Sequence, residues 1–250
     1  MKEFNYKEIA KEIGWNFSKM NYSVERLSKY DYYKNVVEHI TPTTKMLDIG
    51  CGSGEKAARY YSFASKVYLT DIEQEMLNKA KINVEKYYDE NSEAKNKFNF
   101  AILDCNGPFD FPDESFDLVV ARHCGANMSE VYRVLKKGGI FISEDYSEDD
   151  CQELKDLFKR GQGYANEHLY KKVMKDCLDV GFSEINFIKF EEIEYYETVH
   201  DLKYLLTHTP ILNFYNEEDD DKVLKNYIDN FATPKGIKLN RRLYTFTIKK

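Results

Sequence analysis

A glycine-rich segment, Leu47-Asp48-Ile49-Gly50-Cys51-Gly52-Ser53-Gly54, is the part of the chain best suited to binding a ligand. Three glycines at alternate positions after an apolar strand let the backbone turn sharply and let a ligand approach without meeting a Cβ atom. The helix that follows would present free N–H groups and the positive end of its dipole. The segment is therefore a candidate ligand-binding loop, and the alternative is a tight strand–helix turn with no ligand.

The spacing of these glycines differs from that of a loop that binds a nicotinamide dinucleotide. In such a loop the third glycine lies five residues after the first and allows close approach to a pyrophosphate. Here that position is Glu55, which would repel phosphate, and Asp48 stands two residues before Gly50. The pattern therefore favours a ligand with a cationic end over a dinucleotide.

Two further acids are expected at the ends of neighbouring strands. Asp71 lies 21 residues after Gly50, and Asp104 ends the next predicted strand. A carboxylate at the position of Asp71 can accept hydrogen bonds from both hydroxyls of a ribose, whereas the alternative role is a helix N-cap. Asp104 could meet the amino group of an adenine. Because ligands bind at the carboxyl ends of parallel strands, we expect Asp48, Asp71 and Asp104 to converge in space.

Composition narrows the class of protein. The chain has 36 Lys and Arg against 43 Asp and Glu, a net charge of −7, which argues against a general nucleic-acid-binding surface. Its five cysteines are scattered without a CxxC pair, so we expect reduced thiols and no metal site. The N-terminal residues carry charges from Lys2 onward and no apolar run approaches roughly 18 residues, so we expect a cytoplasmic protein without a membrane segment.

Strands and helices alternate along residues 45–145, which predicts a parallel sheet covered by helices on both faces. In chain order the predicted elements are a helix ended by Gly14, a helix ended at Thr41-Pro42, strands at 45–50, 66–70, 98–103, 116–121 and 140–143, intervening helices at 55–61, at 72–88 and from the cap Asn127 to a stop at Lys136–Gly139, a helix ended by Gly181, a strand at 182–190, helices at 200–206 and up to 231, and a final strand through Tyr244, Phe246 and Ile248.

Five pieces of sequence occur in an order that resembles the class I S-adenosylmethionine-dependent methyltransferases. They are LDIGCGSG, Asp71 with Ile72, Asp104 with Cys105, FDLVVAR and VYRVLKKGG, and together they cover about residues 45–145. The resemblance implies an α/β, Rossmann-like fold with a seven-stranded, mostly parallel sheet, helices on both faces and an antiparallel last strand. It also implies that S-adenosylmethionine is the cofactor.

The resemblance carries roles over to individual residues. The loop Gly50, Cys51, Gly52, Ser53 and Gly54 would wrap the methionine part of the cofactor, with Asp48 near its ammonium group. Asp71 would hold the ribose, Ile72 would pack on the adenine, and Asp104 with Cys105 would meet the adenine edge. Arg122, just past the fourth strand, would lie beside the methionine part.

The same resemblance suggests a division of the chain. We expect one methyltransferase domain over residues 1–250, with an N-terminal helical cap at 1–44 and a cofactor-binding core at 45–194 and 241–250. Residues 195–240 form an insertion between the last two strands, and we expect it to build part of the acceptor pocket. The aromatic residues Trp15, Phe17 and Tyr22 could close over that pocket as a lid, or they could simply pack.

Methyl transfer from a sulfonium needs mainly an acceptor aligned about 3 Å from the carbon, and a base only if the acceptor must lose a proton. His123, in the loop after the fourth strand, and His208, in the insertion, are the candidate catalytic residues. The alternative for each is a local packing or capping role. His39, His168 and His200 are expected to be ordinary surface or boundary residues.

Three functions remain open from the sequence. The first is methyl transfer to a small-molecule acceptor. The second is methylation of an RNA base, although Ala121-Arg122-His123-Cys124 lacks the acidic or amide residue followed by Pro-Pro and an aromatic typical of enzymes that methylate base amino groups. The third is a cofactor-binding module without catalysis. The acceptor atom and the oligomeric state are not predicted.

Overall fold

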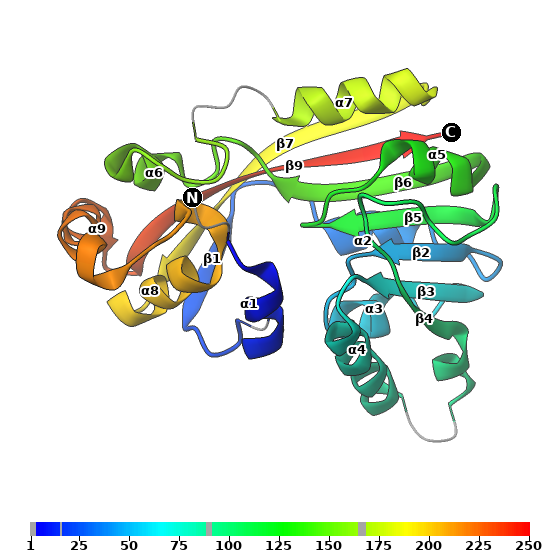
Figure 1. The fold of residues 1–250 in the computed structure, drawn as a ribbon, viewed down its shortest axis with the longest axis horizontal. Coiled ribbons are helices and arrows are strands. Elements are labelled where there is room, and N and C mark those ends of the chain that lie inside the picture. The colour runs from blue at the N-terminus through cyan, green and yellow to red at the C-terminus, as the bar shows by residue number, and fades with distance from the viewer. Residues whose placement is uncertain (1–3, 16, 89–91, 165–168) are drawn as a thin grey trace.

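A computed structural model describes residues 4–15, 17–88, 92–164 and 169–250. Within these residues nine strands form one sheet, in the order β1–β7–β9–β6–β5–β2–β3–β4, with β8 paired to β9 (Figure 1). The strands are β1 (Tyr22–Arg26), β2 (Lys45–Ile49), β3 (Lys66–Asp71), β4 (Phe98–Ile102), β5 (Phe116–Arg122), β6 (Leu135–Tyr146), β7 (Glu184–Tyr196), β8 (Ala232–Thr233) and β9 (Gly236–Lys249).

The central part of the sheet has the predicted direction pattern. Strands β2 to β6 pair in parallel, and β9 inserts antiparallel between β6 and β7. The seven strands β4–β3–β2–β5–β6–β9–β7 therefore confirm the expected Rossmann-like sheet with an antiparallel last strand. Two strands were not predicted: β8, and β1, which lies in the segment 1–44 that was expected to be helical and pairs with the end of β7.

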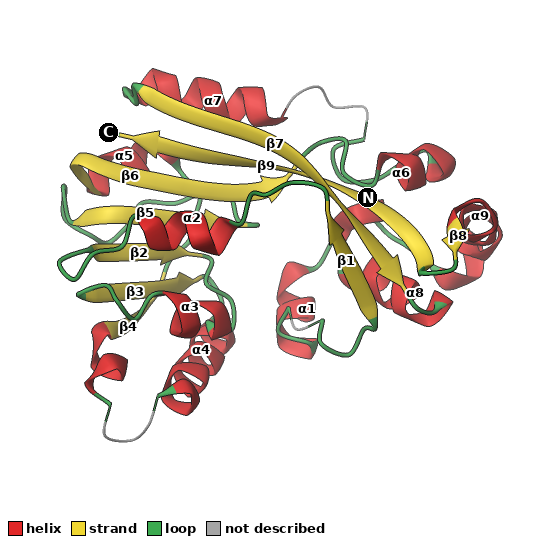
Figure 2. Ribbon diagram, turned by 180° about the vertical axis from the view of Figure 1, so that it is seen from behind, coloured by secondary structure: helices red, strands yellow, loops and turns green. Residues whose placement is uncertain are grey.

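Helices cover both faces of this sheet (Figure 2). The helices are α1 (Tyr6–Glu12), α2 (Tyr32–Glu38), α3 (Glu55–Tyr60), α4 (Gln74–Tyr87), α5 (Met128–Val134), α6 (Gln152–Phe158), α7 (Leu169–Val180), α8 (Val199–His208) and α9 (Glu217–Phe231), with 3₁₀ turns at Glu93–Lys97 and Pro210–Leu212. The predicted cap at Asn127 is confirmed, because its side chain accepts hydrogen bonds from the N–H groups of Ser129 and Glu130. None of the helices among these described residues is both long enough and apolar enough to cross a bilayer.

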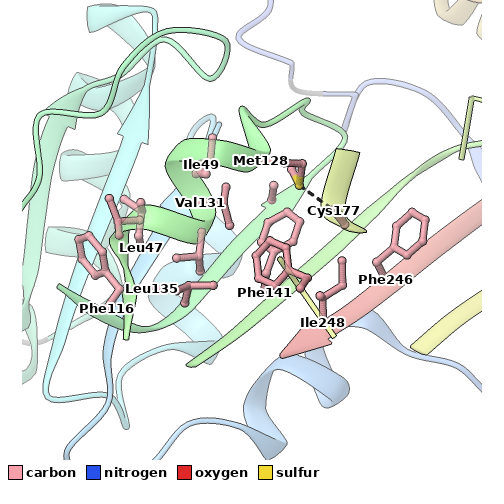
Figure 3. Close-up of a cluster of buried hydrophobic side chains, with 14 of the residues drawn as sticks. Leu47, Ile49, Phe116, Met128, Val131, Leu135, Phe141, Cys177, Phe246 and Ile248 are labelled. Carbon is pink, nitrogen blue, oxygen red and sulfur yellow. Dashed lines mark hydrogen bonds between the residues drawn. The ribbon is translucent and has the colours of Figure 1, made fainter. Parts of the chain in front are cut away.

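The two faces of the sheet bury separate clusters of apolar side chains. Leu47 and Ile49 of β2 point toward α5 and α7, where they pack with Phe116, Val131 and Phe141 (Figure 3). The alternate residues of the same strands, such as Met46 and Leu118, pack on the opposite face with α2, α3 and α4. Successive side chains of a strand point to opposite faces, so a sheet covered on both faces requires apolar residues at consecutive positions. Because Asp48 shares its face with Met46, its carboxyl group lies on the side of α2 and α3.

Beyond the central sheet, β7 and β9 run on as a long antiparallel pair that carries the remaining helices at its far end (Figure 1). Apolar residues of α6, α8, α9 and the ends of these strands form a third cluster. The segment between the two strands therefore runs over residues 197–235, and part of the expected insertion 195–240 is strand.

α5 ends at Val134, just before the segment Lys136–Gly139 that was predicted as a helix stop. That segment is itself part of β6, which begins at Leu135 and so is longer than the predicted strand 140–143. A register irregularity between Phe116 and Leu118 marks the place where β6 joins β5.

Candidate functional site

The glycine loop connects β2 to α3 and lies at the carboxyl ends of the parallel strands. A Cβ atom on Gly50 would lie 2.6 Å from the Cys124 sulfur, and one on Gly54 would lie 2.8 Å from the Ala80 Cβ. Both glycines also have positive φ angles, of +69° and +67°, so other residues would be strained there. A Cβ atom on Gly52 would meet no atom within 4 Å. The loop is thus held tightly at its two ends and leaves space beside its middle.

Asp71, the last residue of β3, contacts this loop directly. One carboxylate oxygen accepts a hydrogen bond of 3.0 Å from the N–H of Gly52, and the other accepts one of 3.0 Å from the N–H of Glu73. Burial raises the pKa of Asp71, and the backbone hydrogen bonds lower it in part. The helix N-cap of α4 is Glu73, not Asp71. Asp71 therefore fixes the loop and the entry to α4, with oxygen lone pairs left to accept further donors.

Ile72, beside Asp71, leaves 58% of its surface exposed, which is unusual for an apolar residue at the end of a buried strand. Asp104 is also exposed, and one of its oxygens accepts a hydrogen bond of 2.9 Å from the N–H of Asn106. The Cys105 thiol is hydrogen-bonded with the thiol of Cys124, which lowers the pKa of Cys105. The contact between Cys105 and Cys124 joins the loops after β4 and β5, and the Leu103 N–H donates a hydrogen bond of 3.1 Å to the Asp71 carbonyl oxygen at the end of β3.

Asp48 is a buried carboxyl group, with 8% of its surface exposed. Within the described part of the chain, no hydrogen bond or ion pair to its carboxylate is found. Burial, and then the charge of Asp71, raise the pKa of Asp48 to about 8. A buried acid of this kind lacks a positively charged or donor partner.

Arg122 lies at the end of β5 on the same face of the sheet as Asp48. Its Nε atom donates a hydrogen bond of 2.8 Å to Glu144 of β6. The guanidinium carbon lies 5.7 Å and 5.5 Å from the ring centroids of Tyr32 and Tyr33 on α2. Arg122 is thus held by a carboxylate and by aromatic rings at the carboxyl end of β5.

His123 follows Arg122 and adopts a positive φ of +54°, which is uncommon for histidine. Its ring stacks on Tyr146 at 4.4 Å between centroids, and its Nε2 atom lies 4.0 Å from a Glu144 oxygen. Burial, and then the charges of Arg122 and Arg241, lower the pKa of His123 well below its usual value. The imidazole is therefore neutral at pH 7, with one ring nitrogen that can accept a hydrogen bond, and it is a weaker base than a free histidine.

His208 has a different environment, at the contact between α8 and α1. Its Nδ1 atom lies 2.7 Å from the carbonyl oxygen of Tyr204, and its Nε2 atom lies 3.5 Å from a Glu12 oxygen. Its ring also stacks on the Tyr204 ring at 4.1 Å. These contacts support the packing alternative for His208, while His123 lies at the carboxyl ends of the strands.

The three aromatic residues considered as a lid do not form one group. Trp15 contacts Tyr6, with ring centroids 5.9 Å apart, while Tyr22 stacks on Tyr196 at 5.4 Å. Phe17 packs against the apolar cluster of the helical segment. The contacts of Phe17 and Tyr22 support the packing alternative for them. Among the other histidines, His39 caps α2 and His200 lies in α8, and His168 falls outside the described residues.

Two residues that the structure brings to this region, Glu144 and Tyr32, were not predicted from the sequence. Glu144, which pairs with Arg122, could have been found by the rule that acids ending parallel strands converge, since it follows the predicted strand 140–143. Tyr32, the first residue of α2, carries no such signal, because nothing local to it indicates that its ring lies beside the guanidinium group of Arg122. In residues 4–15, 17–88, 92–164 and 169–250, no three His, Cys, Asp or Glu side chains are grouped to hold a metal ion.

Comparison with known proteins agrees with this geometry. A family described as "Methyltransferase domain" matches residues 40–209. A sterol 24-C-methyltransferase of Gibberella zeae is 28% identical over 203 residues, which are 72% of this chain and 50% of that protein. The chain thus spans about half the length of the curated relatives it matches first.

Solved structures share the fold at low sequence identity. A putative methyltransferase from Bacillus halodurans has a TM-score of 0.60 and 17% identity, covering 87% of this chain and 96% of its own. The Haemonchus contortus phosphoethanolamine N-methyltransferase 2, solved with S-adenosyl-L-methionine, has a TM-score of 0.58 and 18% identity, covering 99% of this chain and 60% of its own. With the family match and the strand order, the conclusion is that this chain belongs to the methyltransferase-domain family and has the fold of the class I S-adenosylmethionine-dependent methyltransferases.

Proposed function

We propose that this chain binds S-adenosylmethionine and transfers its methyl group to a small organic acceptor. The observation that carries the proposal is a buried carboxyl group without a donor, Asp48, beside a glycine loop fixed by Asp71. A cationic ammonium group would supply the missing partner of Asp48. The lone pairs left on Asp71 suit a pair of neighbouring hydroxyls.

The residues at this edge of the sheet fit the separate parts of the cofactor. Asp48 and the loop Gly50–Gly54 would hold its amino-acid part, with Arg122 nearby, and Asp71 would hold the ribose. The exposed Ile72 offers an apolar surface for the adenine, and Asp104 with Cys105 lies at its edge. When bound, the cofactor supplies a methyl group on a positively charged sulfur, which is already activated for transfer.

The chemistry left to the protein is alignment, exclusion of water and, for some acceptors, removal of a proton. His123 is the residue that we propose for proton removal, because it directly follows β5 at the carboxyl ends of the parallel strands. Its lowered pKa makes it a weak base, so the proposal applies to an acceptor that loses its proton readily. Residues 4–44 and the segment 197–235 would line the acceptor side. His208 is a weaker candidate, since its ring nitrogens face Tyr204 and Glu12.

A small organic acceptor is favoured over nucleic acid by the net charge of −7. Relatives and structural neighbours named for sterol and phosphoethanolamine substrates are consistent with an acceptor of this size. The class of acceptor is tested by methyl transfer from labelled cofactor to extracted small metabolites and to total RNA. Label in RNA alone would favour the RNA alternative, and cofactor binding with no label in either fraction would favour the non-catalytic module.

Cofactor binding itself is tested by titrating the full chain with S-adenosylmethionine and S-adenosylhomocysteine in a calorimeter. We expect one site per chain for each ligand. If neither ligand binds to the folded protein, the proposed function is wrong.

Replacing Asp71 with alanine should weaken cofactor binding by about 2–3 kcal/mol, because charged hydrogen bonds to the ribose are lost. Calorimetric titration with S-adenosylhomocysteine measures this change. The matched control is Glu75→Ala, which removes an exposed acid from the first turn of α4 and should leave the affinity unchanged. Equal affinities of Asp71→Ala and the unmodified protein would show that Asp71 does not hold the ribose.

A further inference from the structure

Asp145 is a partly exposed acid near the carboxyl end of β6, directly after the last residue of that strand that pairs with β5. One of its carboxylate oxygens accepts a hydrogen bond of 2.8 Å from the N–H of Tyr146. In the part of the chain that the structure describes, its other oxygen accepts no hydrogen bond and no cationic side chain pairs with it. That oxygen is not enclosed by protein atoms, so a ligand can contact it. The carboxylate can therefore accept a hydrogen bond from a ligand.

Neighbouring acids on the same segment differ from Asp145, because they have cations within ion-pair distance. The pairs are Glu144 with Arg122 at 2.8 Å, Asp149 with Lys189 at 2.9 Å, and Asp150 with Arg241 at 3.1 Å. Burial and the charges of Asp150 and Glu144 raise the pKa of Asp145 to about 6, although the N–H of Tyr146 lowers it in part. At pH 7.5 the group is therefore mostly ionised, and the described residues do not neutralise its charge.

The end of β6 lies beside the loop that follows β5. Arg122 and Glu144 form the last pair of the two strands, and the N–H of His123 donates a hydrogen bond of 2.8 Å to the Glu144 carbonyl oxygen. Asp145 is the next residue of β6, so it lies at the edge of the sheet at which the glycine loop also lies.

A thiol connects Asp145 with the glycine loop. A Cβ atom on Gly50 would lie 2.6 Å from the sulfur of Cys124, so this thiol packs against the loop. The hydrogen bond with Cys105 and burial raise the pKa of the Cys124 thiol, and the charges of Asp71 and Asp145 raise it further. Because the one thiol is subject to both charges, Asp145 lies close to the residues proposed to hold the cofactor.

Two phenols lie near Asp145 on other elements. Tyr244 is directly opposite it on β9, and Tyr6 belongs to α1, in the N-terminal segment that would line the acceptor side. Burial, and then the charge of Asp145, raise the pKa of both phenols, which are therefore neutral at pH 7. With the Cys124 thiol also protonated, none of the groups that act on Asp145 in the described ranges is a cation.

The charge of Asp145 favours one class of acceptor. A negative charge beside the reacting atoms disfavours an acceptor that must first become an anion, because the two charges repel each other. It favours an amine, whose nitrogen becomes positively charged as it accepts the methyl group. A neutral amine also needs no base before it attacks, in agreement with the weak basicity of His123.

We propose that the acceptor is a primary or secondary amine and that Asp145 is a catalytic residue, which accepts a hydrogen bond from the amine N–H and stabilises the positive charge that develops on nitrogen. This inference rests on the proposed function and adds a substrate class to it. The nitrogen lone pair forms the new bond to the methyl carbon, while the bond from that carbon to sulfur breaks and sulfur keeps the electron pair. The nitrogen then releases one proton to solvent, which gives a neutral methylated amine and S-adenosylhomocysteine.

The first test identifies the atom that receives the methyl group. The full chain is incubated with extracted small metabolites and with S-adenosylmethionine whose methyl group carries deuterium, and the labelled products are fragmented in a mass spectrometer. We expect the label on nitrogen. Label exclusively on oxygen, sulfur or carbon would overturn the inference and leave methyl transfer to a small molecule intact.

The second test replaces Asp145 with asparagine, which keeps the shape of the side chain and removes its charge. At pH 7.5 Asp145→Asn should form the labelled amine roughly 10- to 100-fold more slowly, as expected for the loss of a hydrogen bond to a charged group. Its melting temperature and its affinity for S-adenosylhomocysteine, both measured by calorimetry, should not decrease. The reason is that no ion pair is broken and that the asparagine oxygen can still accept the hydrogen bond from Tyr146.

The pH dependence gives a result that a purely structural role would not produce. The rate of the unmodified protein divided by that of Asp145→Asn is independent of the ionisation of the acceptor and of groups that both proteins share. Since the pKa of Asp145 is about 6, roughly a quarter of this group is ionised at pH 5.5, so the ratio should be several-fold smaller at pH 5.5 than at pH 7.5. The matched control, Asp110→Asn, changes an exposed acid between β4 and β5 and should leave the rate unchanged at both pH values.

The outcomes distinguish the inference from the proposed function. An unchanged rate in Asp145→Asn, or a ratio that does not vary with pH, would show that Asp145 does not stabilise the reacting nitrogen and would overturn the inference. If the unmodified protein binds no cofactor, or yields no labelled small molecule, the proposed function itself has failed and the inference fails with it. Label on nitrogen together with a pH-dependent loss of rate in Asp145→Asn supports both.

Discussion

Replacing Asp48 with asparagine should make the unliganded protein more stable at pH 8 and, at the same time, remove most of its affinity for the cofactor. The two effects have one cause. Burial and the charge of Asp71 raise the pKa of Asp48 to about 8, whereas an aspartate in an unfolded chain has a pKa of about 3.9. Between these values the folded chain holds a proton that the unfolded chain has released, so this group's contribution to stability falls as the pH rises.

Asparagine cannot ionise, so the stability of the variant should not decrease with rising pH on account of this residue. The free energy of unfolding of Asp48→Asn, relative to that of the unmodified protein, should therefore increase between pH 5 and pH 8 by an amount on the order of 1–3 kcal/mol. Urea denaturation at both pH values measures it. The control is Asp104→Asn, a change at an exposed acid that follows β4, two strands away from β2 in the sheet. A variant less stable than the unmodified protein at pH 8 would contradict the prediction.

The affinity for the cofactor should also depend on pH. A cationic ammonium group binds the ionised form of Asp48, so below pH 8 the ligand must displace a proton. For the unmodified protein we expect affinity for S-adenosylhomocysteine to rise on the order of tenfold from pH 6 to pH 7.5. For Asp48→Asn the affinity should be low and nearly constant over this range, and a steep pH dependence retained by the variant would rule out Asp48 as its source.

Removing the guanidinium group of Arg241 should destabilise the protein by about 3–5 kcal/mol, the usual cost of leaving a buried charge unpaired. Arg241 lies in β9 with 3% of its surface exposed. It donates two hydrogen bonds of 3.1 Å to Asp150, ahead of α6, and one of 2.8 Å to Glu194 of β7. Without it, two buried carboxylates would have lost their shared cation.

Denaturant unfolding of Arg241→Met measures this loss, which for a chain of this length corresponds to about 10 °C in melting temperature. The triple variant Arg241→Met, Asp150→Asn, Glu194→Gln should recover most of it, because no unpaired charge remains. The control is Lys189→Met, which breaks a half-exposed pair with Asp149 and should cost less than about 1 kcal/mol. A loss in Arg241→Met no larger than that in the control would show that Arg241 does not stabilise the fold.

The buried ion pairs of Arg241 with Asp150 and Glu194 also lie next to the candidate site. The guanidinium carbon of Arg241 lies 4.2 Å from the centroid of the Tyr146 ring, on which His123 stacks. The charge of Arg241 is one cause of the lowered pKa of His123, after burial and Arg122. In Arg241→Met the pKa of His123 should therefore rise, which a proton NMR titration of the histidine ring can follow.

The central sheet was predictable from the sequence because local patterns and short-range rules specify it. Apolar runs such as 45–49 and 116–121, followed by turn residues, indicate buried parallel strands. Glycines at 50, 52 and 54, with acids at the ends of two strands, indicate one ligand-binding edge, since parallel strands present their carboxyl ends together. The contact of Asp71 with the loop at Gly52 is the direct result of that rule.

The ends of β7 and β9 were not predictable in the same way. The final strand was predicted through Tyr244, Phe246 and Ile248, after an insertion that ends at residue 240, whereas β9 begins at Gly236. In the structure Arg241 occupies an inward position of β9, and the carboxylates that make its burial possible lie 91 and 47 residues away in the chain. A local pattern contains no information on such distant partners.

By itself, then, the amino-acid sequence determined the order of the elements and the loop of glycines and acids, because these depend on backbone geometry and on alternation along the chain. The antiparallel last strand was expected from the family resemblance. Only the tertiary structure decided which buried polar groups have a hydrogen-bond or ion-pair partner and which have none. The lack of a partner for Asp48 and the unpaired hydroxyl of Tyr32 arise from burial beside residues distant in sequence. Burial removes the water that would otherwise satisfy these groups, and the chain must bring a partner or leave room for a ligand.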